Sequence, residues 1–269
     1  MPELPEVETV CEAIKENIKS RDILKFNIFN PNLRWKIDKK INNNISNNHI
    51  NKIYRRGKYI VFSFIHGSLL IHLGMTGVIK LLKKNINNKT SKHDHFEIVF
   101  KNGDVLRYND VRKFGSVHWV EDLKKHFLTK DLGVEPLSKD FNYKYLYKIS
   151  KQKNVSIKNL IMDQKILTGV GNIYASESLY LSKIHPNKKS NQLTKKNHHE
   201  LILSIKKVLK KAIKSGGTSL KDFKNIDGTP GYFKQKLLIY GREYCQCGEK
   251  VKNIKINGRA SFFCTLCQS

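Results

Sequence analysis

The spacing of hydrophobic positions is helical at the start of the chain and becomes strand-like soon afterwards. Within residues 3–18, apolar side chains recur every three to four positions from Val7 to Ile18, which predicts an amphipathic helix with one buried stripe. From about residue 23 to 120, short apolar runs separated by Asn-Gly and His-Gly dipeptides predict strands joined by turns. This spacing of short strands predicts an antiparallel β-sandwich. The runs are 59–64, 69–73, 77–82, 95–100, 105–108 and 116–120.

Helical spacing returns after about residue 130 and precedes a final segment rich in Gly, aromatic residues and cysteine. A Gly-containing break at 168–172 joins two of the helical segments, as in a helix-turn-helix unit, and the last segment ends at Gly216–Gly217, a helix C-terminal signal. We therefore predict an α+β chain of several domains. The helical segments are 142–153, 156–164, 173–183 and 194–214. The expected domains are 1–130, 131–217 and 218–269.

The charge of the chain favours a polyanionic partner such as nucleic acid. Fifty Lys+Arg against 23 Asp+Glu give a formal net charge of +27. Only eight of the fifty are Arg, and Asn, Ile and Lys dominate stretches such as INNNISNN. Drift toward A/T-rich codons would also produce this composition and would leave solvated lysines without a binding role. Charge alone therefore leaves both interpretations open.

The sequence carries neither a membrane-spanning pattern nor a secretory signal. No apolar run reaches the length of about eighteen residues that a transmembrane helix needs, and the charged N-terminus lacks the apolar region of a signal peptide. We therefore expect a cytoplasmic protein without a membrane partner.

Four of the five cysteines form a C-x-C…C-x-x-C pattern near the C-terminus, with 16 residues between the two pairs. Four thiolates at this separation suit a structural zinc ion on a β-hairpin, with Asn257–Gly258 at its turn and Arg259 at its tip. The first pair has only one intervening residue, so a metal-free hairpin is the alternative. Cys11 is separate and is expected to be a small buried residue. The candidate ligands are Cys245, Cys247, Cys264 and Cys267.

Several short motifs allow both a structural and a functional interpretation. A proline at residue 2 followed by Glu3 suits the first turn of a helix. Lys58 in RRGKY lies at a turn that leads into a strand, where a lysine is usually solvated. Arg112 and Phe114 in YNDVRKFGS have the chemistry of a wedge inserted into a base stack. The Gly-x-Gly-Asn of TGVGN presents backbone N–H groups to a phosphate or permits close helix packing.

Together these motifs resemble the bacterial formamidopyrimidine-DNA glycosylases over the whole chain. The matching stretches are MPELPEVET, RRGKY, HLGMTG, KHDHFEI, YNDVRKFG, LGVEPL, MDQKILTGVGNIYASESL, KIHP, GGTSLKDF, DGTPGYF, YGRE and GRASFFCTLCQ. MPELPE, rather than the MPEGPE of the related endonuclease VIII branch, favours an enzyme acting on oxidised purines. The resemblance implies an N-terminal β-sandwich with an N-terminal helix, a helix–two-turn–helix domain and a C-terminal zinc finger at about 235–269. It also implies a monomer that binds double-stranded DNA with no cofactor beyond one zinc ion.

The resemblance further implies a bifunctional DNA glycosylase and abasic-site lyase. After removal of Met1, the secondary amine of Pro2 attacks C1′ of the damaged nucleoside, and Glu3 protonates the opening sugar. The resulting Schiff base permits β-elimination and then δ-elimination. Glu6 supports this end of the chain, Lys58 acts as a proton donor, and Arg259 assists the second elimination.

The remaining family positions are implied to contact DNA. Met75, Arg112 and Phe114 fill the space left by the extruded base, with Arg112 reading the orphaned cytosine. The implied DNA-binding residues are His93, Lys153 and Asn172, which contact the DNA backbone, together with Arg112; the implied lesion-pocket residues are Thr218 and Tyr232. The chain departs from the family in YGREYCQCG, which is shorter by about three residues. If Cys245 did not reach the metal, Arg259 would be displaced.

Two rival functions stay open at this point. Excision of oxidised pyrimidines would use the same Pro2 and Glu3 chemistry. A basic zinc-ribbon protein whose catalysis has decayed would bind DNA without acting on it. Against decay, Pro2, Glu3, Lys58 and Arg259 are all present.

Overall fold

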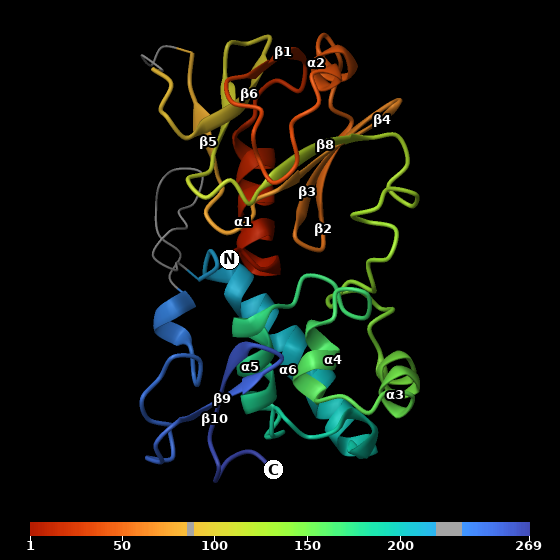
Figure 1. Cartoon of the computed structure of the whole chain (residues 1–269), viewed down its shortest axis with the longest axis vertical. Coiled ribbons are helices and arrows are strands. Elements are labelled where there is room, and N and C mark those ends of the chain that lie inside the picture. The colour runs from red at the N-terminus through yellow and green to blue at the C-terminus, as the bar shows by residue number, and fades with distance from the viewer. Residues whose placement is uncertain (85–88, 219–232) are drawn as a thin grey trace. The chain divides into compact units, whose positions relative to one another are not determined.

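The computed structural model describes residues 1–84, 89–218 and 233–269 and divides into two compact units (Figure 1). The first unit is Met1–Lys130 with the described part of Gly216–Tyr232, and the second is Asp131–Ser215 with Phe233–Ser269. Within the described ranges, every helix is too short or too polar to cross a membrane.

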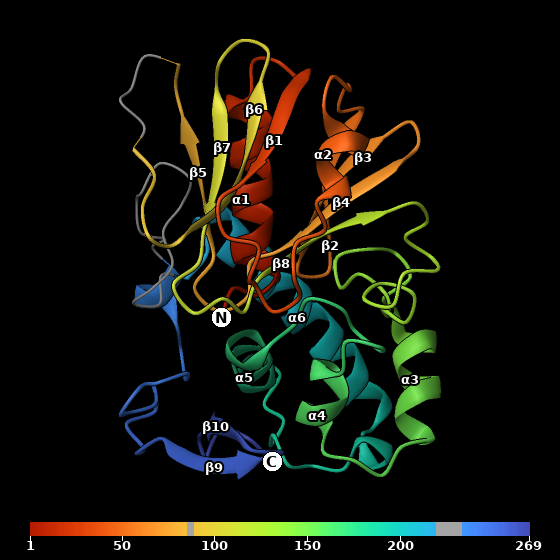
Figure 2. The ribbon, with the colours of Figure 1, turned by 45° about the horizontal axis from the view of Figure 1, so that its top comes forward.

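The first unit is built on two antiparallel four-stranded sheets (Figure 2). One has the order β1 (Ile23–Ile28), β6 (Asp94–Phe100), β7 (Val105–Asn109) and β5 (Val78–Leu82). The other has the order β2 (Lys52–Arg56), β3 (Tyr59–Phe64), β4 (Gly67–His72) and β8 (Ser116–Val120). Both sheets contribute to one hydrophobic core, and the predicted α+β class with a β-rich N-terminal part is confirmed.

The helix α1 (Leu4–Asn17) lies in this core, where it contacts β2 and β3 of one sheet and β5 of the other. The predicted stripe is buried, including Val7, Val10 and Ile14. Glu3 is the N-cap residue, and a capping box with Glu6 satisfies backbone N–H groups that the first turn leaves without helical partners. The start of the chain is therefore held firmly by its own first turn.

The sequence did not predict β1, β2 or the short helix α2 (Lys40–Ile45) as separate elements. In β2 only Ile53 is buried, so the sequence of this strand lacks the alternation of apolar and polar residues that predicts a strand. The helix α2 consists largely of Asn, which favours turns, and it is held by Ile41 and Ile45 on its buried face. Burial of their apolar residues in the core, rather than local sequence preference, stabilises these elements.

The second unit is mainly helical and ends in a β-hairpin. The predicted helices are confirmed, with side chains of Asn142, Ser156 and Thr194 capping three of them. The helix α5 contacts α4, α6 and the hairpin, so it forms the centre of the unit. The elements are α3 (Tyr143–Lys151), α4 (Ile157–Met162), α5 (Asn172–Leu181), η1 (Ser190–Gln192), α6 (Lys195–Lys214), η2 (Phe233–Lys236), β9 (Lys252–Ile256) and β10 (Arg259–Phe263).

Candidate functional site

The start of the chain is a buried cluster of polar groups. Pro2 is buried, and the Glu3 and Glu6 side chains are each only 3% exposed. Oε2 of Glu6 accepts the backbone N–H of Glu3 at 2.8 Å, and Oε1 accepts the backbone N–H of Thr218 at 2.7 Å. The two carboxylate oxygens of Glu6 therefore hold two backbone segments, namely the start of the helix at Glu3 and the distant residue Thr218.

Lys58 occupies a two-residue turn between β2 and β3, after Gly57 with φ of 59°. Its side chain is 8% exposed, which is unusual for a lysine at a turn. Arg55 connects this turn to α1, because it donates to the Glu8 carboxylate through Nε and to the Gly57 carbonyl oxygen through Nη1 at 3.0 Å. Arg55 was not predicted as a site residue, and its only signal in the sequence is its place in the same RRGKY motif as Lys58.

His72 lies close to Lys58 and orders the turn that follows β4. Burial, followed by the positive charge of Lys58, lowers the pKa of His72 to about 4. The imidazole is therefore neutral at pH 7, and its Nδ1 accepts the backbone N–H of Gly74 at 3.1 Å. This bond fixes the backbone immediately before Met75.

The predicted wedge residues come from two segments of the first unit. Met75 is half-buried in the turn after β4, whereas Arg112 and Phe114 are exposed between β7 and β8. The guanidinium carbon of Arg112 lies 4.9 Å from the Phe114 ring centroid. The backbones touch, since a Cβ placed on Gly74 would lie 2.5 Å from the carbonyl carbon of Phe114. The fold thus brings Met75, Arg112 and Phe114 together.

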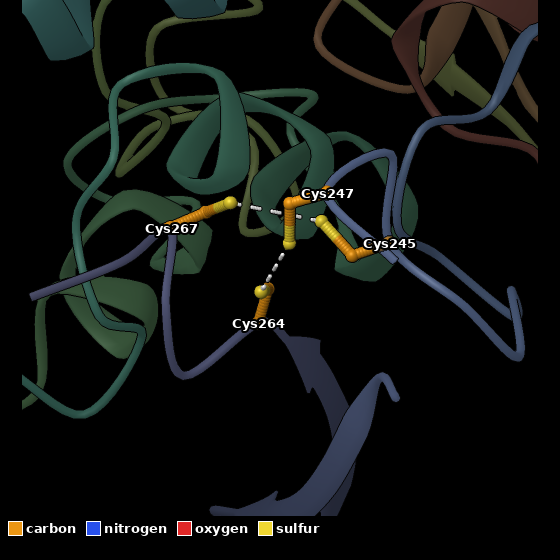
Figure 3. Close-up of side chains that lie close together, drawn as sticks. All are labelled: Cys245, Cys247, Cys264 and Cys267. Atoms are coloured by element: carbon orange, nitrogen blue, oxygen red, sulfur yellow. Dashed lines mark hydrogen bonds between the residues drawn. The ribbon is translucent and has the colours of Figure 1, made fainter. Parts of the chain in front are cut away.

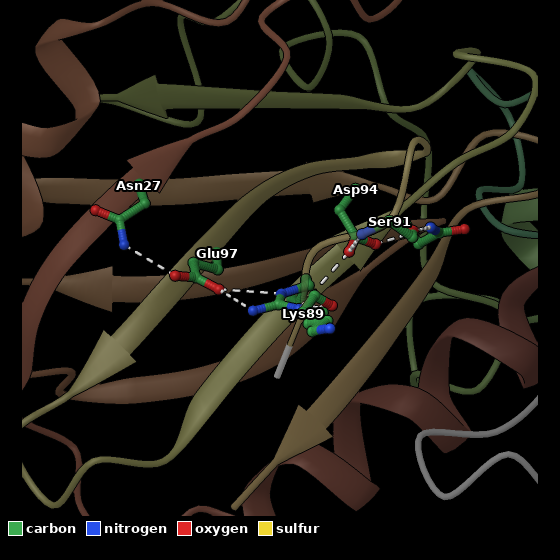
Figure 4. Close-up of polar contacts among 7 residues, drawn as sticks. Asn27, Lys89, Ser91, Asp94 and Glu97 are labelled. Atoms are coloured by element: carbon green, nitrogen blue, oxygen red, sulfur yellow. Dashed lines mark hydrogen bonds and ion pairs between the residues drawn. The ribbon is translucent and has the colours of Figure 1, made fainter. Parts of the chain in front are cut away.

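A buried ion-pair network holds the segment before His93 against the sheet. Figure 4 shows the Asp94 and Glu97 side chains in this network. The Arg107 guanidinium donates to Oε2 of Glu97 at 2.8 and 3.0 Å and to the Lys89 carbonyl oxygen at 3.2 Å. Asp94 accepts the backbone N–H of Ser91 at 2.8 Å.

Burial of Asp94 raises its pKa, but the hydrogen bonds from Ser91 and Asn109 and the charge of Arg107 outweigh it and hold the pKa below its usual value. An ionised Asp94 thereby keeps its hydrogen bonds, and the half-buried His93 has a fixed backbone position.

In the second unit, Lys153 and Arg259 line one pocket of about 390 Å³. Lys153 comes from the turn after α3 and Arg259 from the start of β10, and both side chains are exposed. Asn257 and Asn159 add polar groups to the same pocket. Asp163 also lines the pocket, so the two cations leave one net positive charge there, which together with the amide donors suits an anionic group such as phosphate.

Asn172 is the first residue of α5, behind the N-cap Gly171. Its Nδ2 donates to the Tyr240 hydroxyl at 3.4 Å, so the side chain is tied to the segment that precedes the cysteines. The carboxylate of Glu177 holds the same segment by accepting the backbone N–H groups of Leu238, Ile239 and Tyr240 at 2.7 to 2.9 Å.

The four candidate metal ligands converge in one cluster (Figure 3). Their sulfur atoms all lie within 4.8 Å of one another, with Sγ–Sγ distances of 3.7 Å for Cys245 and Cys267 and 3.6 Å for Cys247 and Cys264. Tetrahedral metal–thiolate bonds of about 2.3 Å place sulfurs about 3.8 Å apart, whereas a disulfide needs about 2.05 Å. The thiols therefore fit a metal ion, and the shortened first pair does not keep Cys245 out of the cluster.

Lys158 links the helices to the hairpin that carries Arg259, a role that the sequence analysis missed. It is 1% exposed, and its Nζ donates to the Ala260 carbonyl oxygen at 3.0 Å and to the Ser261 hydroxyl at 2.7 Å. A lysine on a short amphipathic stretch gives no sequence signal of such burial.

The predicted site residues thus fall into two groups. The first unit contains Pro2, Glu3, Glu6, Lys58, Met75, His93, Arg112, Phe114 and Thr218. The second unit contains Lys153, Asn172, Arg259 and the four cysteines. Thr218 is buried and contributes its N–H to Glu6. Tyr232 lies outside the described residues.

Comparison with known proteins matches both units. Residues 1–117 match the model of the formamidopyrimidine-DNA glycosylase N-terminal domain, and residues 132–224 match that of the formamidopyrimidine-DNA glycosylase H2TH domain. The formamidopyrimidine-DNA glycosylase of Histophilus somni (strain 2336) is 46% identical over 271 residues, covering 100% of this chain and 99% of the relative. That of Haemophilus influenzae (strain PittEE) is 45% identical with the same coverage.

Solved structures agree with this match. The complex between the Lactococcus lactis Fpg and an abasic site containing DNA superposes with a TM-score of 0.89 at 35% identity, over 99% of each chain. MutM in complex with carbocyclic 8-oxo-G containing DNA gives a TM-score of 0.88 at 35% identity, again over 99% of each chain. These matches span both units, and the chain therefore belongs to the formamidopyrimidine-DNA glycosylase family.

Proposed function

We propose that this protein is a base-excision-repair DNA glycosylase that removes oxidised purines, namely 8-oxoguanine and formamidopyrimidines, from double-stranded DNA. It then cleaves the strand at the abasic site by β,δ-elimination. The observation that carries the proposal is the buried cluster at the start of the chain, where Glu6 fixes the backbone of Glu3 directly beside Pro2. Family membership and relatives solved with lesion-containing DNA support the same activity.

The chemistry begins at Pro2. Met1 is 41% exposed and accessible to removal, which makes the Pro2 nitrogen a terminal secondary amine. An α-amino group has a usual pKa of about 8, so a useful fraction is neutral and nucleophilic at pH 7. The amine attacks C1′, Glu3 protonates the ring oxygen as the C1′–O4′ bond opens, and the damaged base leaves with the electron pair of its C1′–N bond and takes up the proton that the amine loses. The resulting iminium acidifies the C2′ proton and permits β-elimination.

Other residues support binding and strand cleavage. Lys58 is held at its turn by the Arg55 tether and acts as a proton donor, and Arg259 assists δ-elimination from the hairpin. Lys153, Asn172, His93 and Arg112 contact the DNA backbone or the orphaned cytosine, and Thr218 and Tyr232 line the lesion pocket.

One zinc ion held by the four cysteines supplies the structural support of this hairpin. The enzyme works as a monomer on DNA in the cytoplasm, with domains 1–130, 131–217 and 218–269.

The test is single-turnover excision from two duplexes, one with 8-oxoguanine opposite cytosine and one with thymine glycol opposite adenine. The proposal predicts faster release of 8-oxoguanine. Faster release of thymine glycol would assign the protein to oxidised-pyrimidine repair. Binding of both duplexes without excision from either would indicate a DNA-binding protein that has lost catalysis.

A further inference from the structure

The side chain of Asp110 is fully buried at the point where the two wedge segments meet. Its Oδ1 accepts the Thr76 hydroxyl at 2.5 Å and the backbone N–H of Arg112 at 3.2 Å. Thr76 follows Met75 directly, and Arg112 lies in the exposed loop. One carboxylate oxygen therefore bonds to both segments.

The second oxygen extends the same network. Oδ2 accepts the backbone N–H of Gly115 at 2.8 Å and lies 3.3 Å from the Tyr108 hydroxyl, which is also 3.3 Å from the Leu73 carbonyl oxygen. The contacts of Asp110 thus bracket the loop at Arg112 and Gly115, on both sides of Phe114. Through Tyr108 they also reach the residue that begins the Met75 turn.

Three glycines make this arrangement possible because side chains would occupy the same space. A Cβ on Gly115 would lie 1.7 Å from the Tyr108 hydroxyl oxygen, and one on Gly77 would lie 2.3 Å from it. A Cβ on Gly74 would lie 2.4 Å from the backbone nitrogen of Gly115. The two backbones are therefore in close contact around a single buried acceptor group.

From these contacts we propose that Asp110 is a positioning residue for base extrusion, which sets Met75 and the Arg112–Phe114 loop in one arrangement before DNA binds. The proposal rests on the proposed function, since it gives these three side chains the task of filling the space left by the lesion. A carboxylate suits this role because it only accepts hydrogen bonds, and every group facing it is a donor.

Asp110→Asn tests the proposal because the side chain keeps its shape while one carboxylate oxygen is replaced by an amide NH₂ group. This group donates hydrogen bonds and would face another donor, so one hydrogen bond is lost. The readout is the single-turnover excision rate on two duplexes. In one, 8-oxoguanine is paired with cytosine; in the other, it lies opposite an abasic analogue, where extrusion is easy and no orphaned base remains. The proposal predicts a rate about tenfold lower on the paired duplex and less than about threefold lower on the unpaired one.

If Asp110 had a purely structural role, the variant would lower the excision rate by the same factor on both duplexes. That result would overturn the proposal, and so would an unchanged excision rate on the paired duplex. Asp104→Asn is the matched control, since Asp104 is also buried in the first unit but binds Lys83 and Asn102 at the β6–β7 turn. It is expected to leave both rates unchanged.

Thr76→Val provides a milder variant in case Asp110→Asn does not fold. It removes the hydroxyl that donates to Oδ1 and also accepts the backbone N–H of Arg112 at 3.2 Å, while Oδ1 still accepts that N–H. The variant is expected to slow excision selectively on the paired duplex, by a smaller factor. If the wild-type protein excises 8-oxoguanine from neither duplex, the proposed function fails and this proposal fails with it. If the wild type excises normally and the variants match it, only the role of Asp110 is wrong.

Discussion

The Glu6 carboxylate accepts the backbone N–H of Thr218, a residue 212 positions further along the chain, at 2.7 Å. The other oxygen of the same carboxylate accepts the N–H of Glu3. Gly217 permits the approach, because a Cβ there would lie 3.1 Å from the Glu6 oxygen. One side chain thus fixes both the helix start that carries Pro2 and the segment that follows α6.

Glu6→Gln is expected to break one of the two hydrogen bonds that this side chain accepts. The amide nitrogen no longer accepts, so one buried N–H loses its partner, and the free energy of unfolding falls by about 2 kcal/mol. Denaturant unfolding and the excision rate on 8-oxoguanine duplexes measure the effect. Glu12→Gln on the exposed face of α1 is the matched control and is expected to change stability only slightly. Equal stability of the two variants would contradict this account of Glu6.

Glu3→Gln separates base excision from the later lyase steps. In the proposed mechanism Glu3 protonates the sugar as the base leaves, so the variant is expected to lose at least about 100-fold in the excision rate. A duplex that already contains an abasic aldehyde needs no base departure, so imine formation on it is expected to persist. Borohydride trapping on both duplexes measures the ratio. A parallel loss on both would mean that Glu3 is needed for the nucleophile itself.

The cysteine cluster predicts one zinc ion per chain, measured by elemental analysis of the purified protein. Cys245→Ser is expected to lower the zinc content and to reduce δ-elimination products, because the hairpin that carries Arg259 loses its support. Cys11→Ala removes a thiol that lies on α1 outside the cluster, and it is expected to retain the metal. Full zinc content in the Cys245→Ser protein would show that Cys245 is not a ligand.

His72 predicts a loss of stability in acid. Its pKa of about 4 in the folded chain lies below the usual 6.5, so the unfolded chain binds the extra proton. The stabilisation is complete above pH 6.5 and is lost as the pH falls toward 4, amounting to about 2 kcal/mol between pH 7.5 and pH 5.

His72→Asn keeps an acceptor for the Gly74 N–H without titrating in this range, and is expected to flatten this part of the profile. Burial also lowers the pKa of His118 to about 4. Its contribution to the pH dependence of stability is the same in both proteins and therefore cancels in the comparison. Identical pH profiles of unfolding for the wild type and His72→Asn would contradict this assignment.

The sequence predicted most of the fold because its strong patterns coincide with burial. The stripe on α1 and the capped helices of the second unit follow from periodicity and capping chemistry. The strand β2 and the helix α2 were missed because their local preferences are weak and the core supplies the stabilisation. Boundaries at 130 and 217 stay predictions.

The residues that support the site were the least predictable. Asp110, Arg55 and Lys158 act through partners far away in the sequence, namely Thr76, Glu8 and Ala260. A charged side chain in a loop or on a short helix is usually solvated, so its burial is visible only in three dimensions. The motifs predict which groups react, whereas the structure shows which side chains hold those groups in place.

In the proposed mechanism the Pro2 nitrogen forms the covalent bond with DNA. The most direct measurement is borohydride trapping on an 8-oxoguanine duplex, followed by protease digestion and mass-spectrometric mapping of the DNA remnant. A protein with an uncleavable N-terminal extension, which blocks the amine, is compared with one extended at the C-terminus. A DNA remnant is expected on Pro2 of the C-terminally extended protein and none on the blocked protein. A remnant on Lys58, or equal trapping of both proteins, would contradict this mechanism.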